Sequence, residues 1–535
     1  MQIIVYYVQD KVIYSSQGKT FTEDYLETLL NDYQRDTIQA FYNLDHAVAC
    51  ICKLIGLSDL EIKQLWITPD PNDDTTGKGR VYHGEYELNY YPKTMLTIDR
   101  GKGYGHPFCI LSDMTQYMTA KVEPNLKDGE IFSRLNVASN IAREVYDSLV
   151  KLGLSPKSLT SPIRAYRNKV LSKMNLPNWK DLPEECANYY YNACTGGWVE
   201  ALTEGHFEKI LDWDLRSAYP FQTRKLIDFR KGKWEKVESV PRHNSGMLGI
   251  FNTMVEMEAD FHPIVYRDED NHNYTPSGTF PAVVTWNKLD YMDYHRLGKA
   301  RVKDGWVWTP NNGLVTYPLK GIMNDLYEKK GKAQTDIDRN VIKRILVGVY
   351  GVTGETLKFD ADIPFGEYFN PCWRAEVENN THLRVMNFCQ ENDITPIAIM
   401  TDGILTDVDL KVNSSTAMGE WKLDSATKGL VMGSGCIALQ GKQKDGDFSL
   451  NYDELVEIIN KDEQIDTITI EKEGFVSIGE AIERNILDKL GQFEINKRSI
   501  VLNHDLKRIY IKEPKSFGEL MKNKYESIPV DASMI

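Results

Sequence analysis

The sequence predicts a mixed α+β protein built from several domains. At 535 residues the chain is longer than one hydrophobic core supports, so roughly two to four domains are expected. Short β-like apolar runs alternate with helical patterns over residues 1–150, which indicates a mixed α/β domain there. Beyond it, groups of strand patterns and groups of helical patterns follow one another, which is typical of α+β architectures.

The N-terminal domain begins with the apolar run IIVYYV, which predicts a strand that a short hairpin continues. Strands are expected at residues 1–8, 11–14, 38–42, 85–90, 95–98 and 108–111. Helical periodicity predicts helices at 22–32 and 45–57, and Gly56 is expected to end the second. The Pro-, Asn- and Gly-containing stretch 69–79 predicts a loop.

The remaining segments follow the same patterns. Residues 151–190 are expected to be helical, with a boundary near Pro177 or Pro183. A β-rich insertion is expected to about residue 315, then a helical segment at 317–350, then strands again. The end of the chain is expected to hold a mixed region at 453–490, a pair of strands at 500–503 and 507–512, and a helix at 516–523.

Composition indicates a globular protein with local rather than general basicity. Apolar residues make up 42% and charged residues 26%, and the formal charge of −14 argues against a wholly basic surface. Basic residues gather at 329–344 and 497–515, either as nucleic-acid contacts or as solvated helix faces. The eight cysteines have no zinc-ligand spacing, and no apolar run is long enough to span a bilayer. We expect reduced thiols, no membrane association and a cytoplasmic location, in the host cytoplasm if the protein is viral.

Two aspartates each follow a β-like apolar run. Asp214 comes after Ile210, Leu211 and Trp213, and Asp402 ends the run IAIMT. Two aspartates at the ends of adjacent strands can hold a pair of cations about 3.5–4 Å apart, which can clamp both oxygens of a phosphoryl transfer. The backbone carbonyl of Leu215 is a natural further ligand. The alternative for either residue alone is a turn former or a helix cap.

Tyr219 follows the first aspartate in the run DLRSAYP at 214–220. Pro220 is expected to start a helix that presents the Tyr219 ring beside the site. There the ring could press on the C2′ edge of a sugar and reject a 2′-hydroxyl, or it could belong to the core.

A basic helix is expected at 340–350. Lys343, with Lys330 or Lys332 behind it, could share one face and bind a triphosphate. Tyr350 could stack on a base pair, and Gly348 and Gly351 would leave room there. The alternative is a solvent-facing amphipathic helix with a glycine C-cap.

These segments carry a family resemblance. DLRSAYP at 214–220 resembles motif A of family B DNA polymerases, KRILVGVYG at 343–351 resembles their motif B, and MTDG at 400–403 resembles the later half of their motif C. TGGW at 195–198 resembles the YxGG segment of the protein-primed branch of small phages and linear plasmids. The order and the spacings also agree over roughly residues 185–440.

The resemblance implies a right-hand polymerase with palm, fingers and thumb, and an N-terminal RNase H-like domain of the exonuclease type. The implied domains are an exonuclease-like domain at 1–180, palm and fingers at 181–445 with the fingers at about 317–351, and a thumb and C-terminal region at 446–535. The implied partners are a DNA template, a primer strand and deoxynucleoside triphosphates, with a terminal protein as an optional primer. The implied cofactors are two Mg²⁺ or Mn²⁺ ions.

By the same resemblance, each candidate residue receives a role. Asp214 and Asp402 would be catalytic, and with Leu215 they would bind the metals. Nucleotide binding would fall to Ser217, Tyr219, Lys330, Lys332, Lys343 and Tyr350. Gly196, Gly197 and Gly351 would lie against DNA.

The sequence also departs from the family pattern. Val347 and Gly348 replace the Asn-Ser pair of motif B, and Met400 replaces the first aspartate of motif C. The stretch 431–437 lacks the Lys-x-Tyr motif that grips the primer, and the segment after Gly351 is short. The first strand lacks the Asp-x-Glu pair of a proofreading exonuclease, although the run NLD at 43–45 resembles a remnant of the second exonuclease motif. The N-terminal domain is therefore expected to have lost hydrolysis, because a two-metal site cannot be filled.

Three functions are compatible with this pattern. The first is a template-directed DNA polymerase of the protein-primed type that lacks proofreading. The second is a related nucleotidyl transferase with altered chemistry, such as primer synthesis, non-templated addition or an RNA product. The third is a non-catalytic scaffold that binds nucleic acid or a replication partner.

Overall fold

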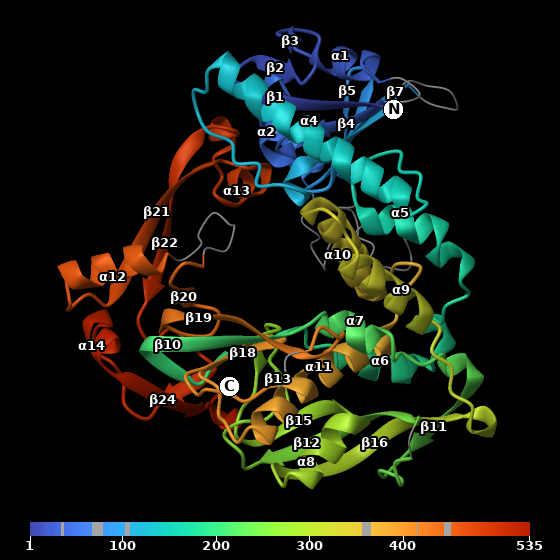
Figure 1. The fold of residues 1–535 in the computed structure, drawn as a ribbon, viewed down its shortest axis with the longest axis vertical. Helices are drawn as coiled ribbons and strands as arrows, with labels where there is room; N and C mark the ends of the chain where they lie inside the picture. Colours follow the sequence, from blue (N-terminus) through green and yellow to red (C-terminus); the bar gives the residue numbers. More distant parts are fainter. Residues whose placement is uncertain are drawn as a thin grey trace.

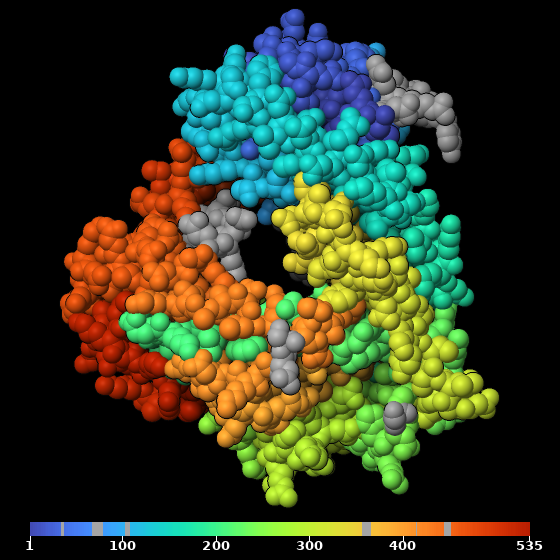
Figure 2. Space-filling model, in the orientation of Figure 1, coloured from blue at the N-terminus to red at the C-terminus, as the bar shows by residue number. Residues whose placement is uncertain are grey.

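The elements form a ring in the computed structural model (Figure 1), and the space-filling view shows an opening at its centre (Figure 2). The structure describes residues 1–33, 37–66, 79–101, 108–244, 246–355, 365–412, 415–442 and 451–535. The predicted loop at 69–79 and most of the short segment after Gly351 lie outside this part of the chain. The eight cysteines are free thiols, as expected. Among the described residues, no helix is long and apolar enough to cross a bilayer.

The N-terminal group is built on one sheet in the order β3-β2-β1-β4-β8-β7-β6-β5. Its strands are β1 (Gln2–Gln9), β2 (Val12–Ser15), β3 (Thr20–Phe21), β4 (Thr37–Phe41), β5 (Arg80–His83), β6 (Tyr86–Tyr91), β7 (Met95–Arg100) and β8 (Phe108–Asp113). β1 and β2 form the predicted hairpin, and β4 runs parallel to β1. Side chains of β1 alternate between two hydrophobic clusters, because both faces of the strand are covered.

Helices cover this sheet and lead away from it. α1 (Tyr25–Asn31) and α2 (Leu44–Leu54) match the predicted helices, and Gly56 follows α2 with a positive φ of 74°. α3 (Asp59–Leu65) packs with them on one face of the sheet, and the long α4 (Asp128–Lys151) covers the other face. The mixed α/β architecture predicted for residues 1–150 is therefore confirmed. The stretch 151–190 is less helical than expected, with only α5 (Pro162–Lys169), short 3-10 turns and the start of α6 (Glu184–Asn192).

The second group is a sheet, here called the central sheet, that lies across the opening from the N-terminal group. Its main path has the strand order β20-β19-β10-β18-β17-β9. This path comprises β9 (Trp198–Ala201), β10 (Thr203–Leu215), β17 (Ala398–Thr401), β18 (Gly403–Thr406), β19 (Trp421–Val431) and β20 (Ile437–Leu439). Off this path, β24 (Lys524–Pro529) also pairs with β10 and joins β23 (Arg508–Tyr510) to the sheet. α7 (Ala218–Thr223) and the mostly buried α11 (Pro371–Glu391) pack together beside it. This central sheet carries both candidate aspartates.

The predicted β-rich insertion forms a separate sheet in the order β11-β16-β12-β15. It comprises β11 (Gly232–Val237), β12 (Leu248–Met257), β15 (Gly278–Thr285) and β16 (Gly298–Pro310), with α8 (Trp286–Tyr294) packed on it. A small hairpin of β13 (Tyr266–Arg267) and β14 (Asn273–Tyr274) extends from it. The insertion lies under the central sheet in Figure 1.

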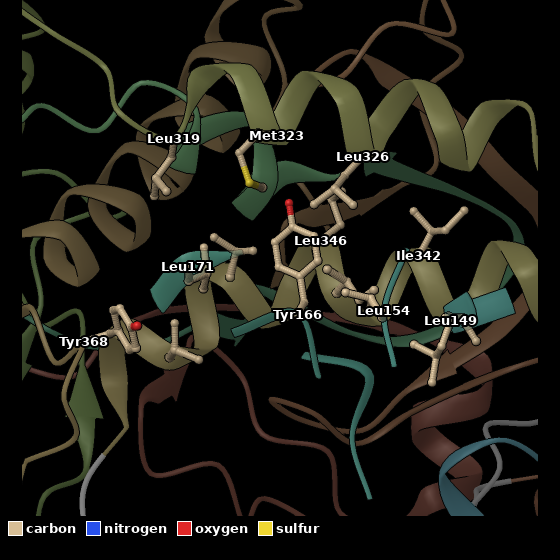
Figure 3. Packing of buried hydrophobic residues seen from close by; sticks show 14 of the residues in the cluster. Leu149, Leu154, Tyr166, Leu171, Leu319, Met323, Leu326, Ile342, Leu346 and Tyr368 are labelled. Atoms are coloured by element: carbon tan, nitrogen blue, oxygen red, sulfur yellow. The ribbon is translucent and has the colours of Figure 1, made fainter. Parts of the chain in front are cut away.

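The helical segment predicted at 317–350 is two helices rather than one. α9 (Lys320–Gly331) and α10 (Asp336–Gly351) are separated at 332–335, where the Thr335 side chain caps α10 by accepting the Asp338 N–H. Leu326 of α9 and Ile342 and Leu346 of α10 pack with Tyr166 of α5 (Figure 3). The two helices therefore pack against α5, which follows the N-terminal group in the sequence.

The C-terminal group closes the ring. Its elements are α12 (Tyr452–Lys461), β21 (Thr467–Phe475), α13 (Ile478–Glu483), β22 (Phe493–Val501), β23 (Arg508–Tyr510), α14 (Phe517–Lys522) and β24 (Lys524–Pro529). The predicted helix at 516–523 is confirmed, but the predicted pairing of 500–503 with 507–512 is wrong. Residues 500 and 501 end β22, which pairs with β21, whereas β23 pairs with β24.

The tip of the β21–β22 hairpin reaches the N-terminal group. Ile478 and Leu490 at this tip are buried in the same hydrophobic cluster as Leu44 and Val48 of α2. Nearby, the Lys53 amino group donates to the Asp488 carbonyl at 2.6 Å. The contact completes a ring around the opening that Figure 2 shows in space-filling form.

Candidate active site

Asp214 lies near the end of β10, in the middle of the central sheet. Its neighbours across the ladders are Gly403 of β18 and Lys422 of β19. Trp213 and Leu215 on either side point into the core and are 7% and 2% exposed. Because side chains alternate along a strand, this pattern turns Asp214 to the opposite face.

Asp402 occupies the tight turn between β17 and β18. Its backbone N–H donates to the Met400 carbonyl at 2.9 Å, and its carbonyl accepts the Leu215 N–H at 3.0 Å. Thr401 has a φ of 67°, which is unusual for a β-branched residue and is a form of strain that clusters at functional sites. The turn thus holds Asp402 directly against the end of β10, and the structure brings both predicted aspartates together.

The two carboxyl groups influence each other electrostatically. Burial, and then the negative charge of Asp214, raise the pKa of Asp402 to about 6. Burial also raises the pKa of Asp214, while Lys422 opposes this change. Ionising both carboxyl groups therefore costs free energy, and a cation bound between them would lower that cost.

Lys422 is a part of the site that sequence reasoning missed. Its amino group lies 3.0 Å from the Asp214 carboxylate and 2.9 Å from that of Asp424. Lys442 continues the row by pairing with Asp424 at 3.0 Å and with Asp212 at 2.5 Å. The only sequence signal is the alternation of Lys422 and Asp424 on one face of β19.

The residues present fit a divalent cation site. Asp214 and Asp402 supply hard carboxylate oxygens from adjacent chain segments, and Leu215 adds a backbone carbonyl beside them. A different acidic cluster, Asp268, Asp270 and His272, lies on the β13–β14 hairpin and is mostly exposed. That cluster includes neither of the two aspartates of the central sheet.

Ser217 and Tyr219 flank the carboxylates on the α7 side. α7 begins at Ala218, two residues before Pro220, and Ser217 precedes it with a φ of 52°. The Lys330 amino group donates to the Ser217 hydroxyl at 3.1 Å. The Tyr219 ring lies 4.8 Å from that of Tyr350, centroid to centroid, so α10 and α7 meet through these two aromatic residues.

The predicted lysines divide between two helices. Lys330 of α9 has a lowered pKa, because it is partly buried and lies near the positive charges of Lys343 and Lys422. Lys343 of α10 also acts on the Asp402 carboxyl, which places both lysines in the field of the aspartates. Lys332 is exposed and pairs with Glu328 of its own helix, so the structure does not bring it to the site.

A buried carboxylate that the sequence did not reveal joins three parts of the site. Glu378 of α11 is 0% exposed and accepts the Tyr350 hydroxyl at 2.7 Å, the Arg374 Nε–H at 2.9 Å and the Gly196 N–H at 2.8 Å. His382 bonds the Gly196 carbonyl at 3.0 Å. The Gly196 peptide is thus held on both sides, at a φ of 73° that favours glycine.

The other candidate glycines serve different purposes. A Cβ on Gly197 would lie 2.7 Å from the Thr401 hydroxyl, so the glycine allows β9 to approach the Asp402 turn. A Cβ on Gly348 would lie 2.7 Å from Ile163, which shows that Gly348 permits packing on α5 rather than space for a base pair. Gly351 has open space around it and lines a cavity of about 1480 Å³ with Lys343 and Tyr350.

The two polar residues of the predicted exonuclease remnant, Asn43 and Asp45, make local contacts. Asn43 caps α2 by accepting the His46 N–H at 3.0 Å. The Asp45 carboxylate accepts the Tyr90 hydroxyl at 2.6 Å and the Lys93 N–H at 2.9 Å. β1 contributes only apolar, tyrosine and glutamine side chains beside them.

Comparison with solved structures matches the chain to Phi29 DNA polymerase. The complex of that polymerase with primer-template DNA and incoming nucleotides gives a TM-score of 0.63 at 12% identity, and the match covers 94% of this chain and 99% of that one. Its complex with single-stranded DNA gives 0.63 at 12% identity, with 94% and 100% coverage. An orthorhombic crystal form gives 0.60 at 12% identity, with 94% and 98% coverage.

These matches show the fold. No protein-family model matches the sequence, and no curated protein matches it either. The chain has the fold of Phi29 DNA polymerase over nearly its whole length, which confirms the predicted α+β right-hand architecture with an N-terminal exonuclease-type domain. The resemblance drawn from the four motifs is confirmed at this level.

Proposed function

We propose that the chain is a template-directed DNA polymerase that adds deoxynucleotides to a 3′ hydroxyl. The observation that carries the proposal is the meeting of Asp214 and Asp402, from distant segments, beside Lys330, Lys343 and Tyr219. The fold supports it, because Phi29 DNA polymerase has been solved with primer-template DNA and incoming nucleotides.

The proposed mechanism assigns a task to each group. Asp214, Asp402 and the Leu215 carbonyl would hold two Mg²⁺ or Mn²⁺ ions, which when bound supply charge that stabilises the attacking and leaving oxygens. Lys343 and Lys330 would bind the phosphates of the incoming nucleotide. Tyr219 would exclude a 2′-hydroxyl, and Tyr350 would contact the nascent base pair.

We propose the same domain boundaries as the sequence suggests. Residues 1–180 would form the exonuclease-like domain without hydrolysis, 181–445 the palm and fingers with the fingers at about 317–351, and 446–535 the thumb and C-terminal region. Gly196, Gly197 and Gly351 would lie near DNA. The protein would act in phage or plasmid replication in the cytoplasm, with a terminal protein as an optional primer.

Two isosteric substitutions test the proposal. Asp214→Asn and Asp402→Asn should each lower deoxynucleotide incorporation on a primed template by on the order of 10³-fold or more, because each removes a metal-binding charge. Asp409→Asn is the matched control, since Asp409 is exposed and pairs with Lys209 away from the site. Circular dichroism checks folding. Full activity in either site variant would refute the assignment.

Loss of familiar motif residues favours one alternative, a nucleotidyl transferase with altered chemistry. Where a Lys-x-Tyr motif is expected, Ser434 instead accepts the Ala201 N–H at 3.0 Å and donates its own N–H to Asp505 at 2.8 Å. Parallel assays with ribonucleotides and deoxynucleotides, with and without template, separate the two. Strict dependence on template and deoxynucleotides eliminates the alternative.

A further inference from the structure

A second cavity, of about 690 Å³, lies at the C-terminal end of α7. Arg224 and Lys225 follow the end of α7, Lys320 begins α9, and all three line this cavity, here called the α7 cavity. Tyr317 and Trp373 provide aromatic walls. None of the candidate site residues lines it, so the α7 cavity is separate from the site at Asp214 and Asp402.

The basic residues of the α7 cavity lack acidic partners. Within the described part of the chain, Arg224, Lys225 and Lys320 make no ion pair, whereas Lys236 nearby in sequence pairs with Glu185 at 2.7 Å. Isolated surface cations without an acidic partner are common in proteins, because water solvates them. Such cations indicate an anion site only where several of them lie close together.

Two of these cations, Arg224 and Lys225, share one aromatic ring with Arg384, which is not a lining residue of the cavity. The Arg224 guanidinium and the Lys225 amino group lie 4.5 Å and 3.9 Å from the centroid of the Phe221 ring, and the Arg384 guanidinium lies 5.6 Å from it. Arg384 Nε is buried and has no hydrogen-bond partner in the described structure. Burial, and then the charges of Arg384 and Arg224, lower the pKa of Lys225 to about 8. Like charges held this close favour a bound anion.

Two further features suit an anion. α9 starts at the cavity without a side-chain cap on its first turn, so its backbone N–H groups add partial positive charge. Glu376 is the one acidic residue among the described lining residues, and burial raises its pKa to about 7. Its carboxyl group is therefore partly protonated at neutral pH and opposes an anion only weakly.

The rest of the wall suits a nucleobase. Leu226 and Met247 are apolar, while Asn287 and Asn380 carry amide groups joined to each other at 2.9 Å. A cavity of this size lies within the range of about 300–1,000 Å³ that holds small organic ligands. Cationic groups that can contact a phosphate, together with an apolar wall and two amides in the same cavity, suit a nucleotide.

We propose that the α7 cavity binds a phosphate-bearing nucleotide, with the phosphate between Arg224, Lys225 and Lys320 and the base toward Trp373 and the asparagine amides. A free nucleotide and a unit of a single strand share this chemistry. The proposal concerns binding alone and does not require catalysis at Asp214.

Lysine footprinting by mass spectrometry tests the proposal in the full-length protein. Acetylation rates of Lys225 and Lys320 are measured without metal, alone and with dTTP, a thymidine hexanucleotide or inorganic phosphate. We expect dTTP or the hexanucleotide to slow both rates by about fivefold or more, and the stronger of the two identifies the source of the ligand. Lys236 should not change. Equal slowing by inorganic phosphate at the same concentration would overturn the assignment to a nucleotide.

The acetylation rate of Lys343, measured in the same spectra, reports on ligand binding at the site of Asp214 and Asp402. Protection of Lys343 without protection of Lys225 and Lys320 would overturn the present proposal and leave the proposed function standing. Protection of Lys225 and Lys320 alone would support the present proposal, while the proposed function, whose metal ions are left out of this assay, is tested separately by Asp214→Asn and Asp402→Asn.

A charge-removal series gives a second measurement. Arg224→Gln should weaken binding of the protecting ligand to the α7 cavity by about tenfold, judged from the ligand concentration that protects Lys320. Lys236→Gln, which removes the same charge from a paired lysine, should leave that concentration unchanged. The same loss in both variants would indicate general electrostatic attraction and would overturn the proposed site.

Discussion

Single residues near the site differ in how well the sequence reveals them. Asp214 and Asp402 could be predicted because each follows an apolar run that marks a strand end. Lys422 and Glu378 could not, because they come from a distant strand and a buried helix without a recognisable motif. Lys330 and Lys332 could not be told apart by sequence, and the structure brings Lys330 to Ser217 while Lys332 pairs with Glu328.

Lys422 acts as an internal cation on Asp214, so its removal should change the response to metal. Lys422→Met should lower the magnesium concentration that half-saturates the rise in Tm by roughly three- to tenfold, because the ion no longer competes with an ammonium group. Lys428→Met is the control, since Lys428 lies on the same strand and pairs with Glu208. Thermal unfolding against magnesium concentration measures the effect. An unchanged midpoint contradicts a role for Lys422 at the metal site.

The raised pKa of Asp402 makes stability depend on pH. The folded protein holds this proton up to a pKa of about 6, above the ordinary value of 3.8, so the stabilising contribution is complete below about pH 4 and is lost as pH rises through 6. Without metal, the unfolding free energy of the wild type should fall relative to that of Asp402→Asn over this range. Urea denaturation at several pH values checks it. A constant difference would show that Asp402 titrates normally.

Helices and strands were predicted well where a local sequence pattern marks them. Strand partners were predicted poorly where the two strands are separated by other elements along the chain. The β1–β2 hairpin lies within one short stretch, and its register follows from alternation. Strand β22 pairs with β21 across an inserted helix, so adjacent sequence suggested the wrong partner. The break between α9 and α10 has a local signal after all, because Thr335 followed by two acidic residues is a typical helix start.

The close approach of α10 to α5 depends on Gly348. Gly348→Ala should destabilise the protein by about 1–3 kcal/mol, because the new Cβ would meet Ile163 at 2.7 Å. Gly351→Ala on the same helix is the control and should be neutral or slightly stabilising, since nothing lies within 4 Å. Denaturant unfolding measures both. Adding Ile163→Ala should recover part of the loss, and no recovery would argue against this contact.

The ring is a property of the whole molecule that no local pattern predicts. Ile478 and Leu490 read as ordinary core positions of a C-terminal element, yet they fill the core of the N-terminal group. His46 of α2 adds ring contacts with Phe475 and Phe493, at centroid distances of 5.0 and 5.6 Å. The N-terminal group and the tip of the β21–β22 hairpin are therefore joined by hydrophobic burial without a covalent link.

A disulfide between α2 and the tip of the β21–β22 hairpin would test whether opening of this contact is needed for DNA to enter the ring. A Cβ at position 491 would lie 3.2 Å from the Cys50 sulfur, so Gly491→Cys should form a disulfide under oxidation, despite the strain of a φ of 73°. Oxidised Gly491→Cys should extend a primer on a linear single strand and fail on a closed circle, and the reduced protein should extend both. Equal extension of the circle in both states would show that the join does not govern access.

The consequence is topological. In the proposed function, a template with a free end would thread the closed protein, whereas a circular template would be linked to it only if Phe475 and its neighbours part from α2. After the contact between α2 and the β21–β22 hairpin re-forms, the protein could leave a circular template only when this contact opens again. Its dissociation rate from a circle would then be set by the rate of opening, even where the protein binds the DNA strand weakly.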